Sequence, residues 1–245
     1  MTMQDLQQNT FHAIRHELGL DRPRDDRPMW QQRLSDRSDF CQALVACRYM
    51  TAEQVALATQ LYRLGRSRDG GVIFWQIDHR DIMRDGKIMH YRPDCHRDHD
   101  RPPSWVTYQL RRVGMLPPAF HGEHCLFGLH LLTDGKPVAI VESEKTAVIM
   151  SALRPAFTWM ATGGKTELNV AKLAPLEGRR TILFPDTDPD GETYREWYDV
   201  AVAATDVYGQ PFTVSSLLEQ QASPQQRKAK IDIADLLFSN RKNDI

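Results

Sequence analysis

Three carboxylates follow short apolar runs in the second half of the chain, and their spacing suits a divalent cation. Glu142 comes directly after the run PVAIV, and Asp186 and Asp188 come directly after TILFP in PDTDPDG. In an open parallel sheet, ligands bind at the carboxyl ends of the strands. Carboxylate oxygens are the ligands that Mg²⁺ prefers, and acids at two strand ends can hold such an ion against a phosphate. We therefore expect Glu142, Asp186 and Asp188 to form a magnesium-binding site.

Two other ligand-binding motifs are matched only in part. Asp-x-Asp-x-Asp-Gly at 186–191 begins like an EF-hand calcium loop, but Trp197 stands where that loop needs a glutamate. Gly-Lys-Thr at 164–166 ends like a P-loop, but Trp159 stands where the first glycine is required. Neither motif is expected to function here. A structural role stays open for the acids, because Asp and Glu at strand ends often cap the following helix.

The elements that must position these acids alternate between strand and helix. From Gly135 onward, short apolar runs resembling strands are separated by helical segments, which include Glu144–Leu153 and Glu192–Tyr208. The polar stretch QQASPQQRKAK (residues 220–230) is expected to be a loop before a last helix at about 234–238. This alternation predicts an α/β fold with a parallel sheet flanked by helices.

The first half of the chain has a different rhythm. Residues 1–38 are polar and charged, with a short helix expected at 11–18. A helical hairpin is expected over 39–64, and its second helix starts at Thr51 with Gln54 completing a capping box. Apolar, β-branched residues and two Gly-containing turns predict a β-hairpin or a β-meander over 70–91. We therefore expect a polar segment (1–38), a smaller α+β N-terminal subdomain (39–132) and an α/β domain (133–245).

The bulk properties indicate an ordinary globular protein. The chain has 245 residues and a formal net charge of −1, so its global charge does not argue for a nucleic-acid partner. The four cysteines are scattered and form no CxxC pair, so we expect them to be reduced thiols of a cytoplasmic protein. The sequence shows no signal pattern and no apolar run of membrane-spanning length. The His and Cys residues between 95 and 125 match no structural zinc spacing.

The acidic motifs resemble those of the Toprim domain, which bacterial primases, topoisomerases and some nucleases share. Its marks are a glutamate after the first strand and a DxD after the third, here in AIVESEKTA and ILFPDTDPDG. Asp232 and Asp235 in KIDIADLL resemble the late acidic motif of primase-type members. The order of the upstream segments, from YRLG to HCLFGLHLL, is similar to the primase core. The chain looks most like the primase-like Toprim proteins of phages and other mobile elements.

The resemblance implies roles for particular residues. Glu142 would act as general acid or base or as a metal ligand, and Asp186 and Asp188 would bind Mg²⁺ or Mn²⁺. Asp190 and Asp232 are weaker candidates for a second metal, and Lys145 and Lys165 could contact phosphates. For both lysines, a solvated helix or turn residue is an equally good interpretation.

The basic stretch between His90 and Arg112 is the candidate nucleic-acid surface. Arginines bind phosphate oxygens, and an aromatic side chain can stack on a base. The candidate residues are Arg92, Arg97, Arg101, Trp105, Arg111 and Arg112. The alternative is a solvated loop with a buried tryptophan, and Asp94, Asp98 and Asp100 dilute the positive charge.

The resemblance implies a nucleotidyltransferase that makes primers on single-stranded DNA from nucleoside triphosphates, with a replicative helicase as a possible partner. Two alternatives are a Toprim nuclease using the same acids and a non-catalytic nucleic-acid-binding module of a replication machinery. Three departures bear on this choice. The chain has no zinc ribbon, Ser143 replaces the usual glycine, and Thr146 stands where a further acid is usual.

Overall fold

The computed structural model describes residues 27–132 and 135–243, with the side chains of 240–243 left out, and the chain forms two compact units. The N-terminal unit ends at Cys125, and the C-terminal unit begins at Leu126. The sequence predicted a boundary between residues 132 and 133. The expected helix at 11–18 lies outside the described residues.

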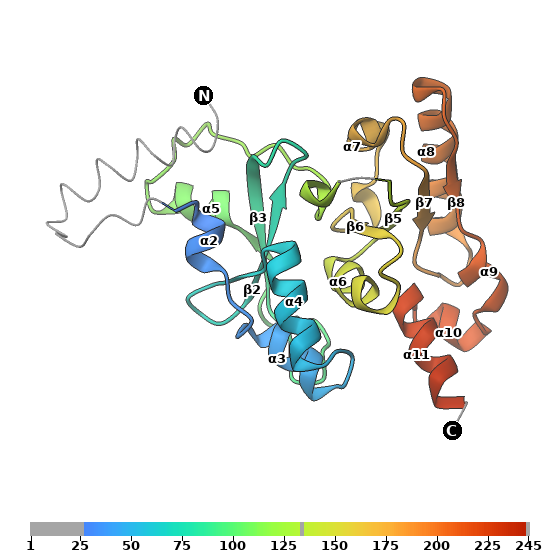
Figure 1. Ribbon diagram of the computed structural model, residues 1–245, viewed down its shortest axis with the longest axis horizontal. Helices are drawn as coiled ribbons and strands as arrows, with labels where there is room; N and C mark the ends of the chain where they lie inside the picture. The colour runs from blue at the N-terminus through green and yellow to red at the C-terminus, as the bar shows by residue number, and fades with distance from the viewer. Residues whose placement is uncertain (1–26, 133–134, 244–245) are drawn as a thin grey trace, which may run out of the picture. The chain divides into compact units, whose positions relative to one another are not determined.

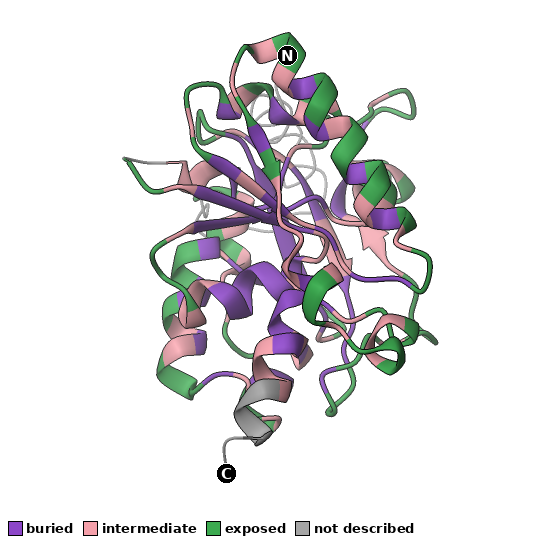
Figure 2. Ribbon diagram, turned by 90° about the vertical axis from the view of Figure 1, so that its right-hand side faces the viewer, coloured by how far each residue is buried: buried purple, intermediate pink, exposed green. Residues whose placement is uncertain are grey.

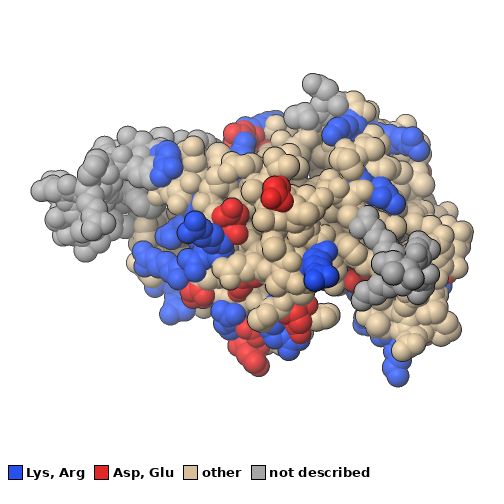
Figure 3. Space-filling model, turned by 60° about the horizontal axis from the view of Figure 1, so that its bottom comes forward, with Lys and Arg blue, Asp and Glu red and all other residues tan. Residues whose placement is uncertain are grey.

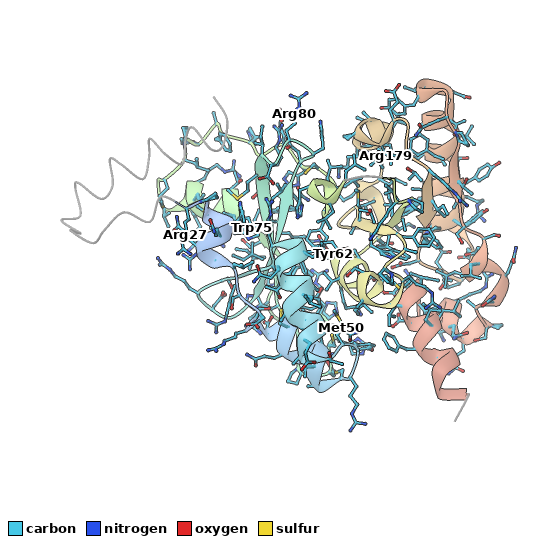
Figure 4. The ribbon with its side chains drawn as sticks, in the orientation of Figure 1. Arg27, Met50, Tyr62, Trp75, Arg80 and Arg179 are labelled. Carbon is cyan, nitrogen blue, oxygen red and sulfur yellow. The ribbon has the colours of Figure 1, made fainter. Side chains whose placement is uncertain are left out.

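An antiparallel sheet with strand order β1-β2-β3-β4 organises the N-terminal unit (Figure 1). Its elements are α2 (Met29–Arg33), α3 (Asp39–Ala46), α4 (Ala52–Tyr62), β1 (Gly65–Arg66), β2 (Val72–Ile77), β3 (Met83–Met89), β4 (Ser104–Trp105) and α5 (Val106–Arg112). The predicted helical hairpin is therefore confirmed, and so is the capping box of Thr51 and Gln54 at the start of α4. The predicted β-hairpin is β2–β3, and Arg80 lies at its outer end (Figure 4).

Both faces of this hairpin are buried, because every residue of β2 is apolar except Gln76 and none is exposed. One face carries Trp75, which is labelled in Figure 4. Its ring lies over Gly86, the residue opposite it on β3. A Cβ at Gly86 would fall 2.6 Å from this ring, so only glycine is accommodated opposite Trp75. On the other face, the ring of Phe74 contacts the rings of Phe40 from α3 and Tyr91.

A parallel sheet with strand order β6-β5-β7-β8 organises the C-terminal unit and is flanked by helices, as predicted. Its elements are η1 (Leu129–Leu131), β5 (Val138–Val141), α6 (Glu144–Leu153), β6 (Thr158–Ala161), η2 (Lys165–Glu167), α7 (Val170–Leu173), η3 (Ala174–Leu176), β7 (Thr181–Phe184), α8 (Glu192–Tyr208), β8 (Phe212–Val214), α9 (Leu217–Gln221), α10 (Pro224–Lys228) and α11 (Ile233–Asn243). The strands form the buried centre, and exposed residues lie on the outer helix faces (Figure 2).

The stretch 220–230, predicted as a loop, contains the helix α10 and the end of α9. Ser223 caps α10 in a capping box with Gln226, and Pro224 occupies the first helical turn, where its missing N–H costs nothing. Arg227 also forms an ion pair with Glu219 of α9. The prediction was wrong because it weighed the polarity of the segment and overlooked its capping residues.

Candidate functional site

The ends of β5 and β7 bring the two acidic motifs to one edge of the parallel sheet. The strands are direct neighbours in parallel register, with Val138 opposite Thr181 and Val141 opposite Phe184. Glu142 and Asp186 follow these strands, so both emerge at the same edge. β5 lies between β6, the next strand in sequence, and β7, so the strand order reverses between β5 and β7. Such a reversal is the topological switch point at which open α/β sheets bind ligands.

The backbone of Glu142 is held by the turn after β6. The N–H of Gly163 donates to the carbonyl of Glu142 at 3.0 Å, and the hydroxyl of Thr162 lies 3.3 Å from the same oxygen. On its other side, Ser143 caps α6 by accepting a hydrogen bond from the N–H of Thr146 at 3.1 Å. The position of Glu142 is thus defined by contacts to two other segments.

Asp186 is partly buried, and its carboxyl group lies among other acids. Its Oδ1 atom is buried and has no hydrogen-bond partner among the residues that the structure describes. Burial raises the pKa of Asp186 well above its usual value, and the negative charges of Asp232, Glu142 and Asp235 raise this pKa further. The charge of Lys145 acts in the opposite direction. The carboxyl group therefore lies in a site where a positive charge would be stabilised.

Asp232 reaches this group from the distant start of α11. It is buried, and its carboxylate accepts a hydrogen bond from the N–H of Asp235, whose carboxylate accepts one from the N–H of Asp232. The hydroxyl of Thr146 in α6 donates to Asp232 Oδ2 at 2.5 Å, and Ser143 Oγ lies 2.7 Å from the same hydroxyl. Thr146, which replaces the acid usual in primases, thus positions another acid.

Asp188 accepts hydrogen bonds from backbone N–H groups at the start of α8. Its carboxylate accepts hydrogen bonds from the N–H groups of Asp190, Glu192 and Thr193 at 3.1, 2.9 and 2.7 Å. Burial by itself would raise the pKa of Asp188, but the hydrogen bonds from Thr193, Glu192 and Asp190 outweigh it and hold this pKa well below its usual range. Asp190 is exposed. The structure therefore groups Glu142, Asp186 and Asp232, whereas Asp188 is used by the helix.

The two predicted phosphate-binding lysines are in different situations. Lys145 is partly buried in the first turn of α6 and contributes positive charge at Asp186. The ammonium of Lys165 lies 2.7 Å from a carboxylate oxygen of Glu192 and 3.6 Å from one of Glu196, so α8 neutralises its charge. Lys145 is thus the lysine that the structure places at the acidic group.

In the predicted nucleic-acid surface, some of the arginines form ion pairs with nearby aspartates, whereas others are exposed. Arg101 pairs with Asp98 at 2.7 Å, and Arg92 lies 3.4 Å from Asp94. Arg97 and Arg112 are exposed. Trp105 and Arg111 line a pocket that is treated below. Figure 3 shows one face of the molecule, on which basic and acidic side chains are interspersed.

The side chains at the sheet edge that carry oxygen ligands are Glu142, Asp186 and Asp232, and carboxylate oxygens are the ligands that Mg²⁺ prefers. Within residues 27–132 and 135–243, no three His, Cys, Asp or Glu side chains converge as a ready-made metal-binding group. Mg²⁺, however, keeps several waters and is often bound by one or two carboxylates together with substrate phosphates. The unpartnered oxygen of Asp186 beside the charge of Glu142 is suited to such an ion.

Sequence reasoning missed the polar residues that organise the acids. Ser143 as the cap of α6 could have been found, since Ser before a helical run is a capping signal. The hydrogen bond from Thr146 to Asp232 had no such signal, because the two residues are 86 positions apart.

These features define the chain as an α/β protein in which a parallel sheet carries clustered acids at its carboxyl edge, preceded by an antiparallel unit. A family model described as a domain of unknown function, DUF6371, matches residues 38–187, which is more than half of the chain. The protein therefore belongs to the DUF6371 family. None of the curated proteins matches the sequence.

Several solved structures are similar to the chain. The primase fragment of the bacteriophage T7 primase-helicase protein has 16% identity and a TM-score of 0.47, with 75% of this chain and 66% of that chain covered. A DNA primase domain from Pseudomonas aeruginosa has 19% identity and a TM-score of 0.39, with 78% and 63% covered. The chain thus spans slightly less than two thirds of either structure. At these scores the likenesses carry no conclusion about activity.

Proposed function

We propose that this protein is a metal-dependent, primase-like nucleotidyltransferase of the Toprim type that acts on single-stranded DNA. The observation that carries the proposal is the buried, unpartnered oxygen of Asp186 at the end of β7, beside the charges of Glu142 and Asp232. A buried carboxylate oxygen without a hydrogen-bond partner, close to other acids, lowers the stability of the fold, which supports a functional reason for it. The motif resemblance to primases supports the choice of reaction.

The roles follow from the surroundings of each side chain. Asp186 and Glu142 would hold Mg²⁺ or Mn²⁺, which would neutralise phosphate charge during nucleotide transfer. Glu142 lies at the open end of β5 and would accept or deliver a proton at the reacting hydroxyl. Asp232, fixed by Thr146 and by Asp235, would add negative charge beside Asp186. Lys145 would contact a phosphate oxygen of the nucleoside triphosphate.

The template would contact the N-terminal unit through exposed arginines. Arg97 and Arg112 are exposed and would bind backbone phosphates. Arg92 and Arg101 would also bind phosphates after their ion pairs with Asp94 and Asp98 break. Binding of this kind depends on salt, with a slope of about −0.7 per phosphate contact on single strands. A replicative helicase remains a proposed partner by resemblance.

Primer synthesis on single-stranded DNA tests the proposal. Wild type is compared with Glu142→Gln, Asp186→Asn and the control Asp206→Asn, an exposed acid on α8. We expect both site variants to lose about 10²-fold or more of the metal-dependent product, as for removal of a general acid or base, and the control to keep full activity. Full activity of Glu142→Gln would contradict the site assignment. No product from wild type under Mg²⁺ or Mn²⁺ would contradict the reaction.

One observation favours a second candidate, a non-catalytic nucleic-acid-binding module. Asp188, a metal ligand in the Toprim pattern, accepts hydrogen bonds from the backbone N–H of Asp190 and from two N–H groups of α8. Mn²⁺ binding measured by electron paramagnetic resonance separates the two candidates. Binding that is lost in Asp186→Asn supports an active centre, whereas DNA binding without Mn²⁺ uptake supports the module. Cleavage of DNA without added nucleotides would indicate the nuclease alternative.

A further inference from the structure

A second polar pocket lies within the N-terminal unit. It has a volume of about 670 Å³, which is within the usual range for small-molecule sites. Its lining comes from β3, β4, α5 and the segment 121–124, and includes Asp85, Trp105, Thr107, Tyr108, Arg111 and Gly122. None of these residues belongs to the acidic site of the C-terminal unit.

The floor of this pocket presents a carboxylate oxygen and a hydroxyl that lack ordinary hydrogen bonds. Asp85 is 1% exposed, and its Oδ1 accepts hydrogen bonds from the N–H groups of Gly86 at 2.7 Å and Thr107 at 3.0 Å. Its Oδ2 lies 3.6 Å from His124 Nε2, which is beyond hydrogen-bond distance. Thr107 is 3% exposed, and its hydroxyl is buried with no hydrogen-bond partner in the described parts of the chain.

Gly122 shows that these two atoms face the same space. A Cβ built on Gly122 would lie 2.9 Å from Asp85 Oδ2 and 3.2 Å from Thr107 Oγ1. Any other residue at this position would therefore cover both atoms with a methyl group or displace them. With glycine at this position, a hydrogen-bond acceptor and a hydroxyl lie side by side next to Gly122, and neither is covered by a side chain of this residue.

The walls of the pocket are aromatic and its edge is basic. The ring of Trp105 is partly exposed and packs on the ring of His124 with their centroids 4.1 Å apart, while Tyr108 is 49% exposed. Arg111 also lines the pocket. An acid with aromatic walls would suit an organic cation, but the guanidinium of Arg111 would repel one. A planar ligand with an N–H edge and an anionic group matches this lining, because its ring suits the aromatic walls, its N–H edge suits Asp85 and its negative charge suits Arg111.

We propose that this pocket binds a nucleobase, which stacks against Trp105 and is recognised at its amino edge by Asp85 Oδ2 and Thr107 Oγ1, with its phosphate at Arg111. Guanine, adenine and cytosine present an exocyclic amino group that Asp85 can accept from. Uracil and thymine present a carbonyl oxygen there, which the carboxylate repels. The pocket therefore prefers amino-bearing bases. It does not need the metal chemistry of Glu142, and the base can belong to a free nucleotide or to single-stranded DNA.

Calorimetric titration of the full chain in EDTA tests this pocket, because EDTA removes any contribution of a metal at the acidic site. The probes are GMP, AMP, CMP and UMP in one arm, and the oligonucleotides dC6 and dT6 in the other. We expect amino-bearing bases to bind about tenfold or more tightly than UMP or dT6, since one good base contact is worth about 1–3 kcal/mol. Binding of mononucleotides identifies a nucleotide site, and binding of oligonucleotides alone identifies a site for single-stranded DNA.

Two variants and one control make the test specific. In Asp85→Asn the amide oxygen can keep both backbone N–H bonds, so the amide nitrogen faces the pocket and the preference should reverse toward uracil and thymine. Gly122→Ala keeps every charge but should weaken binding of all bases at least tenfold. Asp81→Asn makes the same chemical change at an exposed turn of this unit and should behave as wild type. Circular dichroism verifies that each variant is folded.

The proposal is overturned if neither nucleotides nor oligonucleotides bind at millimolar concentration. It is also overturned if wild type binds all bases equally, or if folded Asp85→Asn and Gly122→Ala bind as wild type does. Because the titration contains no metal and measures no catalysis, its result does not depend on whether the protein synthesises primers.

Discussion

Asp186 and Asp188 are separated by one residue, yet their pKa values are shifted in opposite directions. Asp186 is partly buried beside other acids, and burial of its carboxyl group together with their negative charges raises its pKa. Asp188 receives several hydrogen bonds from the start of α8, and they lower its pKa despite its burial. Burial and neighbouring negative charges thus raise one pKa, and hydrogen bonds lower the other. These hydrogen bonds indicate that Asp188 contributes to stability, which the Toprim resemblance did not imply.

We predict that Asp188→Ala lowers the free energy of unfolding by about 1–3 kcal/mol at pH 7 in EDTA, because three buried or partly buried N–H groups lose their acceptor. A carboxyl group with a lowered pKa in the folded state stabilises the protein above its ordinary pKa of 3.8, and this contribution is lost as the pH falls further. The difference between wild type and variant should therefore shrink below about pH 4.

Urea unfolding at pH 7 and at pH 3 measures this difference, with Asp190→Ala as the control from the same loop. The side chain of Asp190 is exposed, so its removal should change stability by less than about 0.5 kcal/mol. An equal effect of the two substitutions at pH 7 would show that Asp188 contributes nothing special to the start of α8.

At the scale of elements, α6 and α11 are joined through one side chain of each. Thr146 stands in the first turn of α6, and Asp232 precedes the first residue of α11. The hydroxyl of Thr146 satisfies Asp232 Oδ2, while the other oxygen of Asp232 caps α11. Asp232 thereby connects the helix after β5 to the last helix of the chain, and it brings a third acid to the sheet edge.

Thr146→Val retains the shape of the side chain but removes the donor to a buried carboxylate. We predict a loss of about 1–3 kcal/mol in the free energy of unfolding, measured by urea denaturation. Ser151→Ala is the matched control on the same helix, because its hydroxyl only donates to the carbonyl of Val148 in its own helix. If Thr146→Val is no more destabilising than Ser151→Ala, the connection between α6 and α11 is not stabilising.

At the scale of the whole molecule, the protein has two units with separate cores and two kinds of polar site. The N-terminal unit buries Trp75 and the ring cluster around Phe74, and the C-terminal unit buries β5 entirely. No helix in the described parts of the chain is long and apolar enough to span a membrane. The net charge of −1 leaves any affinity for DNA to local groups of arginines.

Separate cores predict additive effects of core substitutions. Leu44→Ala in the N-terminal unit and Ile140→Ala in the C-terminal unit remove side chains that are 0% exposed, so each should cost about 2–5 kcal/mol. In the double variant the two costs should add within about 0.5 kcal/mol. Urea unfolding, followed by probes in each unit, measures them. A coupling of 1 kcal/mol or more would contradict the independence of the two cores.

The sequence by itself was sufficient for the features that depend on neighbouring residues. Runs such as PVAIV and TILFP predicted buried parallel strands, because both faces of such strands are covered. The bounds of α6 and α8 were predicted correctly, since their apolar spacing is local. The parallel arrangement then placed Glu142 and Asp186 at one edge of the sheet, although the sequence could not separate metal binding from capping at these acids.

Only the tertiary structure decided which polar atoms have partners. Asp188 is occupied by α8, Lys165 is paired with Glu192, and Thr146 reaches Asp232 across 86 positions. The pocket at Asp85 depends on Gly122, which no local pattern connects to it. Helices and strands are encoded by short-range spacing, whereas hydrogen bonding and burial depend on segments that meet only after folding. The grouping of acids at one edge of the sheet was therefore predictable, and the hydrogen-bond partners of each acid were not.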